Sequence, residues 1–164
     1  MKIKIKRLNP DIPIPKKESG GAVCMDVHVS QIITQHNSSV TVLLGFATEI
    51  EKGYKGCIVP RSSFTQKGWI MQNSPAQIDS DYRGEWMIKF QAIPHHLSDE
   101  LIDAIKEDKT FPYIDDELIY PKFPYKVGDR CAQIYFEKEE YCEFEEVLEL
   151  SNTVRGEGGF GSTN

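Results

Sequence analysis

The sequence predicts an all-β domain, a barrel or sandwich of many short strands, on the basis of three observations. Residues 2–6 (KIKIK) alternate strictly between charged and apolar side chains, which is the period of a strand with one solvated face. Short apolar runs recur along the chain, and clusters of Gly, Pro, Asn and Asp separate them. The 164 residues are enough for one domain with a core of its own. Short strands with such punctuation are typical of β-barrels and sandwiches.

The remaining strands are expected at apolar runs that follow one another along the chain. Residues 40–50 (VTVLLGFATEI) form the longest run, interrupted by Gly45, where we expect a bulge or a close approach of another backbone. Further strands are expected at 57–60, 85–93, 130–138 and 141–150. The turn formers between them lie at 51–54, 73–75, 81–84 and 127–129.

Residues 94–125 break this pattern and are expected to form an insert in the single domain. A short helix is expected at 98–109, because Ser98 can cap it and Lys106 and Lys109 suit its last turn. The Pro- and aromatic-rich residues that follow lengthen the connection, and connections this long are often functional. Two interpretations stay open: a surface loop packed on the barrel, or an interaction surface for a protein partner.

Composition limits the classes of partner. The chain has 19 basic and 25 acidic residues, a net charge of −6. This balance argues against direct nucleic-acid binding, which depends on many Lys and Arg contacts, but it allows a small phosphorylated ligand held by a few Arg side chains. No apolar run is long enough to cross a membrane, and the basic N-terminus has no hydrophobic stretch after it. We therefore expect a cytoplasmic protein without membrane contact.

Cysteine and histidine spacing gives no sign of a metal centre. The four cysteines, Cys24, Cys57, Cys131 and Cys142, are far apart in the chain and form no CxxC pair. Without a secretory signal we expect reduced, buried thiols rather than disulfides. The four histidines show no HExxH spacing, so a zinc site is not expected.

Residues 78–85 (IDSDYRGE) are the first candidate for chemistry. Hydrolysis of a triphosphate needs a carboxylate for the water, donors for the phosphates and a divalent metal. Asp79 can be held at a strand edge here, although a lone Asp beside a turn is usually only a turn former. Arg61 and Ser62 offer a guanidinium and a hydroxyl after another apolar run. Taken singly, each of these signals is weak.

Residues 155–164 hold four of the chain's 12 glycines and are expected to form a mobile C-terminal arm. Arg155 could bind an anion there, and Phe160 could stack on a ring. A frayed terminus is the alternative that composition alone favours.

Taken together, five segments in order resemble the five motifs of the trimeric dUTP pyrophosphatase (dUTPase) family. They are 22–27 (AVCMDV), 60–63 (PRSS) with 67–68 (KG), 73–84 (NSPAQIDSDYRG), 128–134 (GDRCAQI) and 155–163 (RGEGGFGST). Only the 94–125 stretch and an expected turn at 30–39 lie well outside the pattern. The resemblance implies a single domain over 1–164, a distorted β-barrel of the jelly-roll kind, and a homotrimer in which each C-terminal arm closes over a neighbour's pocket.

The resemblance also implies the reaction and the groups that perform it. Asp79 would activate the water that attacks the α-phosphorus of dUTP, which gives dUMP and pyrophosphate. Tyr82 would stack on the deoxyribose and leave no room for a 2′-hydroxyl. Asn73 and the backbone up to Ile78 would pair with the edge of uracil. Burial of unmatched polar groups would reject cytosine.

Phosphates and metal are assigned in the same way. Ser62, the N–H of Ser63 and Gln133 would contact the phosphates, with Arg61 in a supporting role. Arg155 would bind the γ-phosphate and Phe160 would cover the uracil ring. The magnesium ion, Mg²⁺, would be held mainly by the triphosphate, with Asp26 reaching it through water.

Departures from the family pattern define the alternatives. Ala76 stands where the family usually has Gly, and this bears on how tightly the hairpin reads uracil. A related dCTP deaminase would need a Glu at the position of Lys89, and Lys cannot supply the same base. The other alternative is a regulatory binding module of the same fold.

Overall fold

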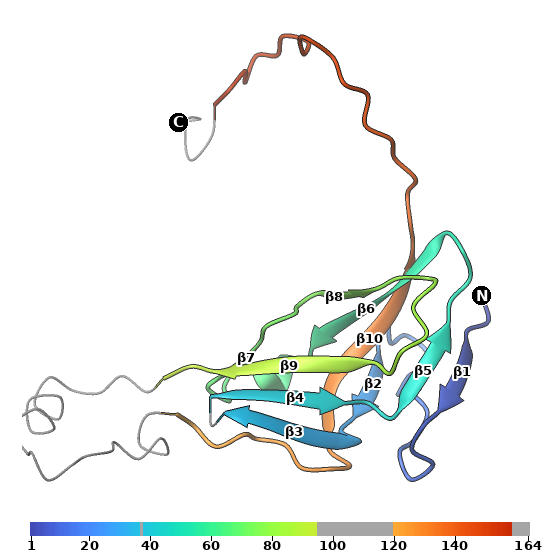
Figure 1. Cartoon of the computed structure of the whole chain (residues 1–164), viewed down its shortest axis with the longest axis vertical. Helices are drawn as coiled ribbons and strands as arrows, with labels where there is room; N and C mark the ends of the chain where they lie inside the picture. Colours follow the sequence, from blue (N-terminus) through green and yellow to red (C-terminus); the bar gives the residue numbers. More distant parts are fainter. Residues whose placement is uncertain (37, 95–119, 159–164) are drawn as a thin grey trace, which may run out of the picture.

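The computed structural model describes residues 1–36, 38–94 and 120–158, and in them it confirms the predicted all-β fold. Two four-stranded antiparallel sheets and one two-stranded sheet make up the domain (Figure 1). The small sheet joins β1 (Lys4–Arg7) to β5 (Phe46–Glu49). A single 3₁₀ turn, η1 (Ser62–Phe64), follows β6 in the described part of the chain.

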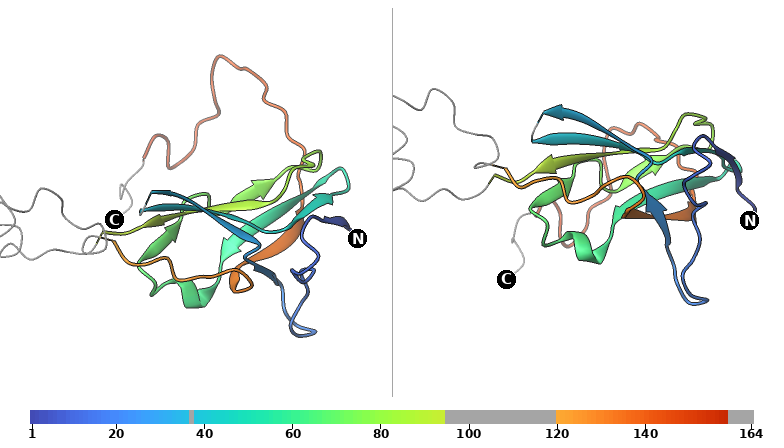
Figure 2. Two further views of the ribbon diagram at one scale, coloured as in Figure 1. Left: turned by 60° about the horizontal axis from the view of Figure 1, so that its bottom comes forward. Right: turned by 90° about the horizontal axis from the view of Figure 1, so that it is seen from below.

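The strands of the two larger sheets come from distant parts of the sequence. The order of the first sheet is β2 (Met25–His28), β10 (Arg130–Lys138), β6 (Tyr54–Pro60) and β8 (Ala76–Ile78). The order of the second is β3 (Gln31–His36), β4 (Ser39–Leu43), β9 (Met87–Ala92) and β7 (Trp69–Met71). The two sheets face each other as layers (Figure 2).

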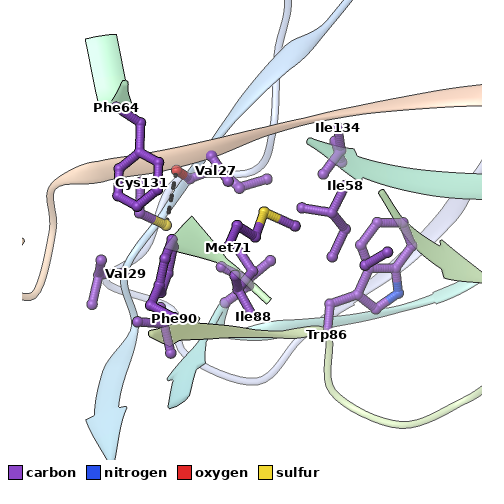
Figure 3. Packing of buried hydrophobic residues seen from close by; sticks show 14 of the residues in the cluster. Val27, Val29, Ile58, Phe64, Met71, Trp86, Ile88, Phe90, Cys131 and Ile134 are labelled. Carbon is purple, nitrogen blue, oxygen red and sulfur yellow. Dashed lines mark hydrogen bonds between the residues drawn. The ribbon is translucent and has the colours of Figure 1, made fainter. Parts of the chain in front are cut away.

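The core lies between these layers and takes side chains from both sheets (Figure 3). Ile58 of β6 and Ile88 and Phe90 of β9 are fully buried, and along β9 buried and exposed residues alternate as the pleat requires. Trp86 is also fully buried, and its indole Nε1 donates to Thr48 Oγ1 at 3.1 Å. Burying a large ring with its polar atom satisfied is strongly favourable.

Gly45 interrupts the longest predicted run, but the atoms that a Cβ there would meet are side-chain atoms of Ser30 and Asn9 rather than another backbone, and no bulge interrupts the β4–β9 pairing. Its φ of +76° is a left-handed conformation, and a Cβ there would lie 2.9 Å from Ser30 Oγ. The chain therefore turns at this residue, and residues 40–50 contribute to two strands in different sheets, β4 and β5.

The prediction of a strand at 141–150 is wrong for the chain as it stands. These residues form no strand, and all of them are exposed. They leave the barrel after β10 as an extended arm (Figure 1), and no strand of the described residues pairs with them. The expected turn at 30–39 is also wrong in part, because β3 occupies most of it and pairs with β4.

The four cysteines are free thiols, but only Cys57 and Cys131 are buried. Cys142 lies on the extended arm and is exposed, which contradicts the prediction that all four are buried. Burial raises the pKa of the Cys131 thiol to about 12.

The predicted helix at 98–109 and most of the 94–125 insert lie outside the described residues, so the helix and the partner-binding role stay predictions. Among the residues that are described, no helix is long and apolar enough to cross a membrane.

Candidate active site

Asp79 lies directly after β8, at the strand end where the sequence analysis placed it. Its side chain is exposed, and its carbonyl accepts a hydrogen bond from Tyr82 N at 3.2 Å. Arg83 closes the same turn, since its Nη1 donates to the carbonyls of Ser80 at 2.7 Å and Tyr82 at 3.0 Å. These hydrogen bonds fix the backbone of the turn, and the Asp79 carboxylate has no hydrogen-bond partner or ion pair within the described residues.

Tyr82 is held by its own turn as well. Its hydroxyl donates to the carbonyl of Glu85 at 3.1 Å, and the ring lies so close to Gly84 that a Cβ there would collide with it. Glu85 is fixed in turn, because its Oε1 accepts from Gly45 N at 2.8 Å. Tyr82 as a whole residue is 38% exposed, which leaves room for a stacked ligand.

A hollow of about 550 Å³ opens beside these groups, and we call it the hairpin pocket. Its lining residues are Gln72, Asn73, Ser74, Pro75, Ala76, Gln77, Ile78, Asp79, Tyr82, Glu85 and Met87. Seven of these eleven residues belong to the connection between β7 and β8 or to β8 itself, and the other four follow β8 up to the first residue of β9. The predicted residues Asn73, Ile78, Asp79 and Tyr82 thus come together in one pocket.

The side chain of Asn73 is tied to the neighbouring strand. Its Oδ1 accepts from the backbone N–H of Lys89 at 3.1 Å, and its Nδ2 lies 3.5 Å from the carbonyl of Met87. The amide thus anchors the hairpin to β9. The side chain of Lys89 is exposed.

Ala76 bears on the fit of the pocket, because it replaces the usual Gly. It pairs with Ile58 in the β6–β8 ladder, is 8% exposed and belongs to the buried core. Ala76 thus belongs to the buried core and at the same time lines the hairpin pocket.

The second group of predicted residues surrounds Asp26 on β2, whose side chain is 6% exposed. Arg130 Nη1 donates to its Oδ2 at 3.0 Å, and Gln133 Nε2 donates to its Oδ1 at 3.1 Å. Arg61 Nε pairs with Oδ1 at 3.3 Å. We call these four residues the polar cluster. One carboxylate facing two guanidinium groups leaves an excess of positive charge, which favours phosphate binding.

Strand register explains how the polar cluster forms. β10 is the central strand between β2 and β6, and Gln133 is paired with Asp26 on one side and Val59 on the other. Arg61 follows the end of β6 and donates from Nη1 to the carbonyl of Arg130 at 3.3 Å. The sequence analysis missed Arg130, although it lies within the GDRCAQI segment and so could have been found there.

His28 borders the polar cluster, opposite Arg130 in the β2–β10 ladder. Its Nδ1 is buried and has no hydrogen-bond partner in the described part of the chain. Burial lowers the pKa of its imidazole, and the nearby Asp26 carboxylate partly opposes this shift.

Comparison with known proteins decides the family. The family model for dUTPase matches residues 10–95 and 120–164. The chain is 34% identical to the deoxyuridine 5′-triphosphate nucleotidohydrolase of Helicobacter pylori (strain J99), over 99% of this chain and 97% of the relative. The corresponding enzyme of Nautilia profundicola is 38% identical over 99% of both chains. The chain belongs to the dUTPase family.

Solved dUTPase structures show the same fold. The Staphylococcus bacteriophage 80alpha dUTPase with dUPNHPP superposes with a TM-score of 0.74 at 22% identity, over 99% of this chain and 98% of that one. A mutant dUTPase of phage phi11 of S. aureus, which coordinates a structural Mg(II) ion, gives 0.65 at 16% identity, over 93% of this chain and 100% of that one. The jelly-roll architecture expected from the resemblance is therefore confirmed.

In this member of the dUTPase family the two groups of site residues lie at opposite ends of β6. Ile78 pairs with Gly56 near the start of the strand, whereas Arg61 follows its last residue, Pro60. Because a strand rises ~3.3 Å per residue, Asp79 and the Ser62 turn are on the order of 20 Å apart. That distance exceeds the length of a triphosphate.

The C-terminal residues stand apart from both groups. Arg155 is exposed on the arm, and its Nε donates to the carbonyl of Gly158 at 2.8 Å. Phe160 lies outside the described residues. Among the described residues, no three His, Cys, Asp or Glu side chains gather as a metal site.

Proposed function

We propose that this protein hydrolyses dUTP to dUMP and pyrophosphate by attack of water on the α-phosphorus. This reaction limits the uracil available to DNA and supplies dUMP for dTMP synthesis. The observation that carries the proposal is the hairpin pocket with the exposed Asp79 carboxylate at its rim, in a chain of the dUTPase family.

Asp79 is proposed to hold and deprotonate the attacking water. The turn is closed by hydrogen bonds of its backbone. Within the described residues the Asp79 carboxylate makes no hydrogen bond or ion pair, so it can accept a hydrogen bond from a water molecule. A positioned carboxylate base is worth a large factor in rate because it removes the proton as the new P–O bond forms.

Recognition of the base is proposed to rest on the hairpin backbone between Asn73 and Ile78. Since the Asn73 amide is engaged with β9, its side chain supports the hairpin and its backbone faces the pocket edge. A fixed pattern of backbone donors and acceptors rejects cytosine, whose edge leaves buried groups unpaired. With Ala76 in the buried core, the close approach that excludes the 5-methyl of thymine is retained.

Tyr82 is proposed to select the sugar. The hydroxyl bond to Glu85 and the contact with Gly84 hold the ring in place, so it cannot retreat to admit a 2′-hydroxyl. Ribonucleotides are excluded by this fixed ring.

The polar cluster and the adjoining turn are proposed to hold the phosphates. Ser62 and Ser63 are exposed on η1 and would supply a hydroxyl and a backbone N–H, while Gln133 and Arg61 contribute donors beside them. Arg155 would add a contact to the γ-phosphate when the arm closes, and Phe160 would cover the base.

Magnesium fits this arrangement as an ion carried by the substrate. The Asp26 carboxylate accepts hydrogen bonds from Arg130 and Gln133, while Arg61 Nε lies 3.3 Å from it as an ion pair without a hydrogen bond; about two of its roughly four lone-pair positions therefore stay open to a metal-bound water. Mg²⁺ bound to the phosphates would neutralise their charge and make the α-phosphorus easier to attack.

A homotrimer is proposed to complete each site. The separation of Asp79 from the Ser62 turn requires a second copy to bring the two groups to one ligand. The arm supports this arrangement, because Phe144, Leu148 and Leu150 are almost fully exposed on it and need a surface to cover them. Removing residues 155–164 should abolish turnover and leave the trimer intact.

The test is a substrate panel with purified protein and Mg²⁺. Pyrophosphate release from dUTP should be far faster than from dCTP, dTTP or UTP. Comparable rates on dTTP would show that Ala76 has opened the pocket and that the specificity claim is wrong. Deamination of dCTP is disfavoured, because Lys89 stands where that chemistry needs a Glu.

A further inference from the structure

Five aromatic rings pack together behind the phosphate-binding turn, and we call Phe64, Trp69, Phe90, Phe123 and Tyr125 the aromatic cluster. The centroid of Phe123 is 5.1 Å from Trp69, 5.4 Å from Phe90 and 5.7 Å from Tyr125. Phe64 lies 5.2 Å from Phe90 and is stacked on Tyr125 at 5.9 Å with an interplanar angle of 15°. Offset and edge-to-face ring pairs at these distances are attractive beyond their buried area.

Phe64 connects this cluster to the phosphate-binding turn. It is the last residue of η1 and the buried one, at 4% exposure, while Ser62 and Ser63 are exposed. Within the turn, Phe64 N donates to the carbonyl of Arg61 at 2.9 Å and Thr65 Oγ1 donates to that of Ser62 at 3.0 Å. The turn is thus a closed unit that the Phe64 ring fastens to the core.

Phe123 and Tyr125 come from the chain that returns after residues 95–119, and the departing chain is fastened at the same place. Ile93 N donates to the carbonyl of Gly68 at 2.8 Å, and Trp69 Nε1 lies 3.0 Å from the carbonyl of Pro121. Gly68 has a φ of +69°, and a Cβ there would lie 2.9 Å from Pro121 Cγ. Both ends of the insert therefore meet at Gly68 and Trp69.

Tyr125 acts in this cluster through its ring. Its hydroxyl oxygen is buried without a hydrogen-bond partner in the described part of the chain. Burial raises the pKa of this phenol to about 12, so it stays neutral over the working range of pH. A buried hydroxyl without a partner costs stability, so its removal should do no harm.

We propose that Tyr125 and Phe123 are positioning residues for the Ser62–Ser63 turn and set the affinity for the triphosphate part of the substrate. The stack of Tyr125 on Phe64 fixes where the turn lies relative to Arg61 and Gln133. The proposal rests on the proposed function in one respect, that the turn binds phosphate. It extends that function, because Phe123 and Tyr125 at the end of the insert then contribute to phosphate binding.

The proposal is tested by removing the Tyr125 ring and by comparing the binding of dUTP with that of deoxyuridine, a ligand without phosphates. Tyr125→Leu should raise the KM for dUTP about tenfold and leave kcat within about threefold, because only phosphate contacts are misplaced. Inhibition of dUTP turnover by deoxyuridine, which has no phosphate, should stay unchanged. Tyr125→Phe should match the unmodified protein in every one of these measurements.

The matched control is Val42→Ala, which opens a cavity at a fully buried residue of β4 that is not part of the aromatic cluster. It should lower Tm and leave both KM and deoxyuridine inhibition unchanged. The proposal is overturned if Tyr125→Leu behaves in this way, or if dUTP and deoxyuridine lose affinity by equal factors. Phe123→Leu, at a half-buried residue, gives the same comparison if Tyr125→Leu does not fold. Failure of the unmodified protein to hydrolyse dUTP would instead overturn the proposed function.

Discussion

The hairpin pocket and the polar cluster, for which we propose different tasks, are built in opposite ways. The pocket takes nearly all its groups from residues 72–87, and backbone hydrogen bonds fix them. The polar cluster draws Asp26, Arg61, Arg130 and Gln133 from three different strands or strand ends, and charge holds them together. A rigid local backbone suits the reading of a base, whereas converging charges suit a flexible phosphate chain. Changes in the first region should therefore alter chemistry and specificity, and changes in the second should alter phosphate affinity.

The largest effect is expected from Asp79→Asn in the hairpin region. The amide cannot take a proton from water, so kcat should fall on the order of 10³-fold while binding of a non-hydrolysable dUTP analogue persists. Asp81→Asn, in the same exposed turn, is the matched control and should change kcat by less than about threefold. Substantial turnover by the Asp79 variant would remove this residue from its role.

The polar cluster should respond differently, through affinity and stability. Asp26→Ala leaves Arg61 and Arg130 facing each other without their anion, which should cost about 1–3 kcal/mol of unfolding free energy. The KM for dUTP should rise tens of times, and deoxyuridine inhibition should be unaffected. Denaturant unfolding and steady-state kinetics measure the two effects. An unchanged KM would show that the polar cluster does not contribute to the binding of the substrate phosphates.

The hairpin pocket could be predicted from the sequence further than the polar cluster, because its contacts are local in the chain. Asp79, Tyr82 and Gly84 lie within one turn, so their relation could be predicted from adjacent residues. The contacts of Asp26 with Gln133 and Arg130 depend on the register of β2 against β10, more than a hundred residues apart, which no local pattern records. Arg130 could have been named from its place in the GDRCAQI segment, but its pairing with Asp26 could not.

The strand predictions failed at segments where strand formation depends on whether a pairing partner is present. Residues 141–150 have the apolar content of a strand, but a strand needs a neighbouring strand to pair with, and among residues 1–36, 38–94 and 120–158 none pairs with them. A turn was expected at 30–39, yet pairing with β4 makes most of this segment the strand β3. In both cases the pairing partner outweighed local propensity.

Gly84→Ala tests whether the Tyr82 ring in the hairpin region selects the sugar, and its expected effect is smaller than those of the Asp79 and Asp26 variants. The added methyl would collide with the Tyr82 ring and displace it, so the ratio of kcat/KM for dUTP over UTP should fall about tenfold. Tyr82→Phe removes only the hydroxyl bond to Glu85 and should change this ratio by less than about threefold. Competition assays with both nucleotides measure it, and an unchanged ratio in the Ala variant would contradict sugar selection by the ring.

The smallest effect is expected from His28, beside the polar cluster. Burial lowers its pKa below the ordinary 6.5, so the unfolded chain takes up this proton at a higher pH than the folded protein. The folding stability that depends on the neutral imidazole is complete above pH 6.5 and is lost as the pH falls from there toward the folded pKa. The Tm of the unmodified protein should therefore drop more between about pH 7.5 and 5.5 than that of His28→Gln. An equal drop in both proteins would mean that the acid sensitivity arises elsewhere. Deoxyuridine inhibition should be the same in both, because the hairpin pocket contains none of the groups that act on His28.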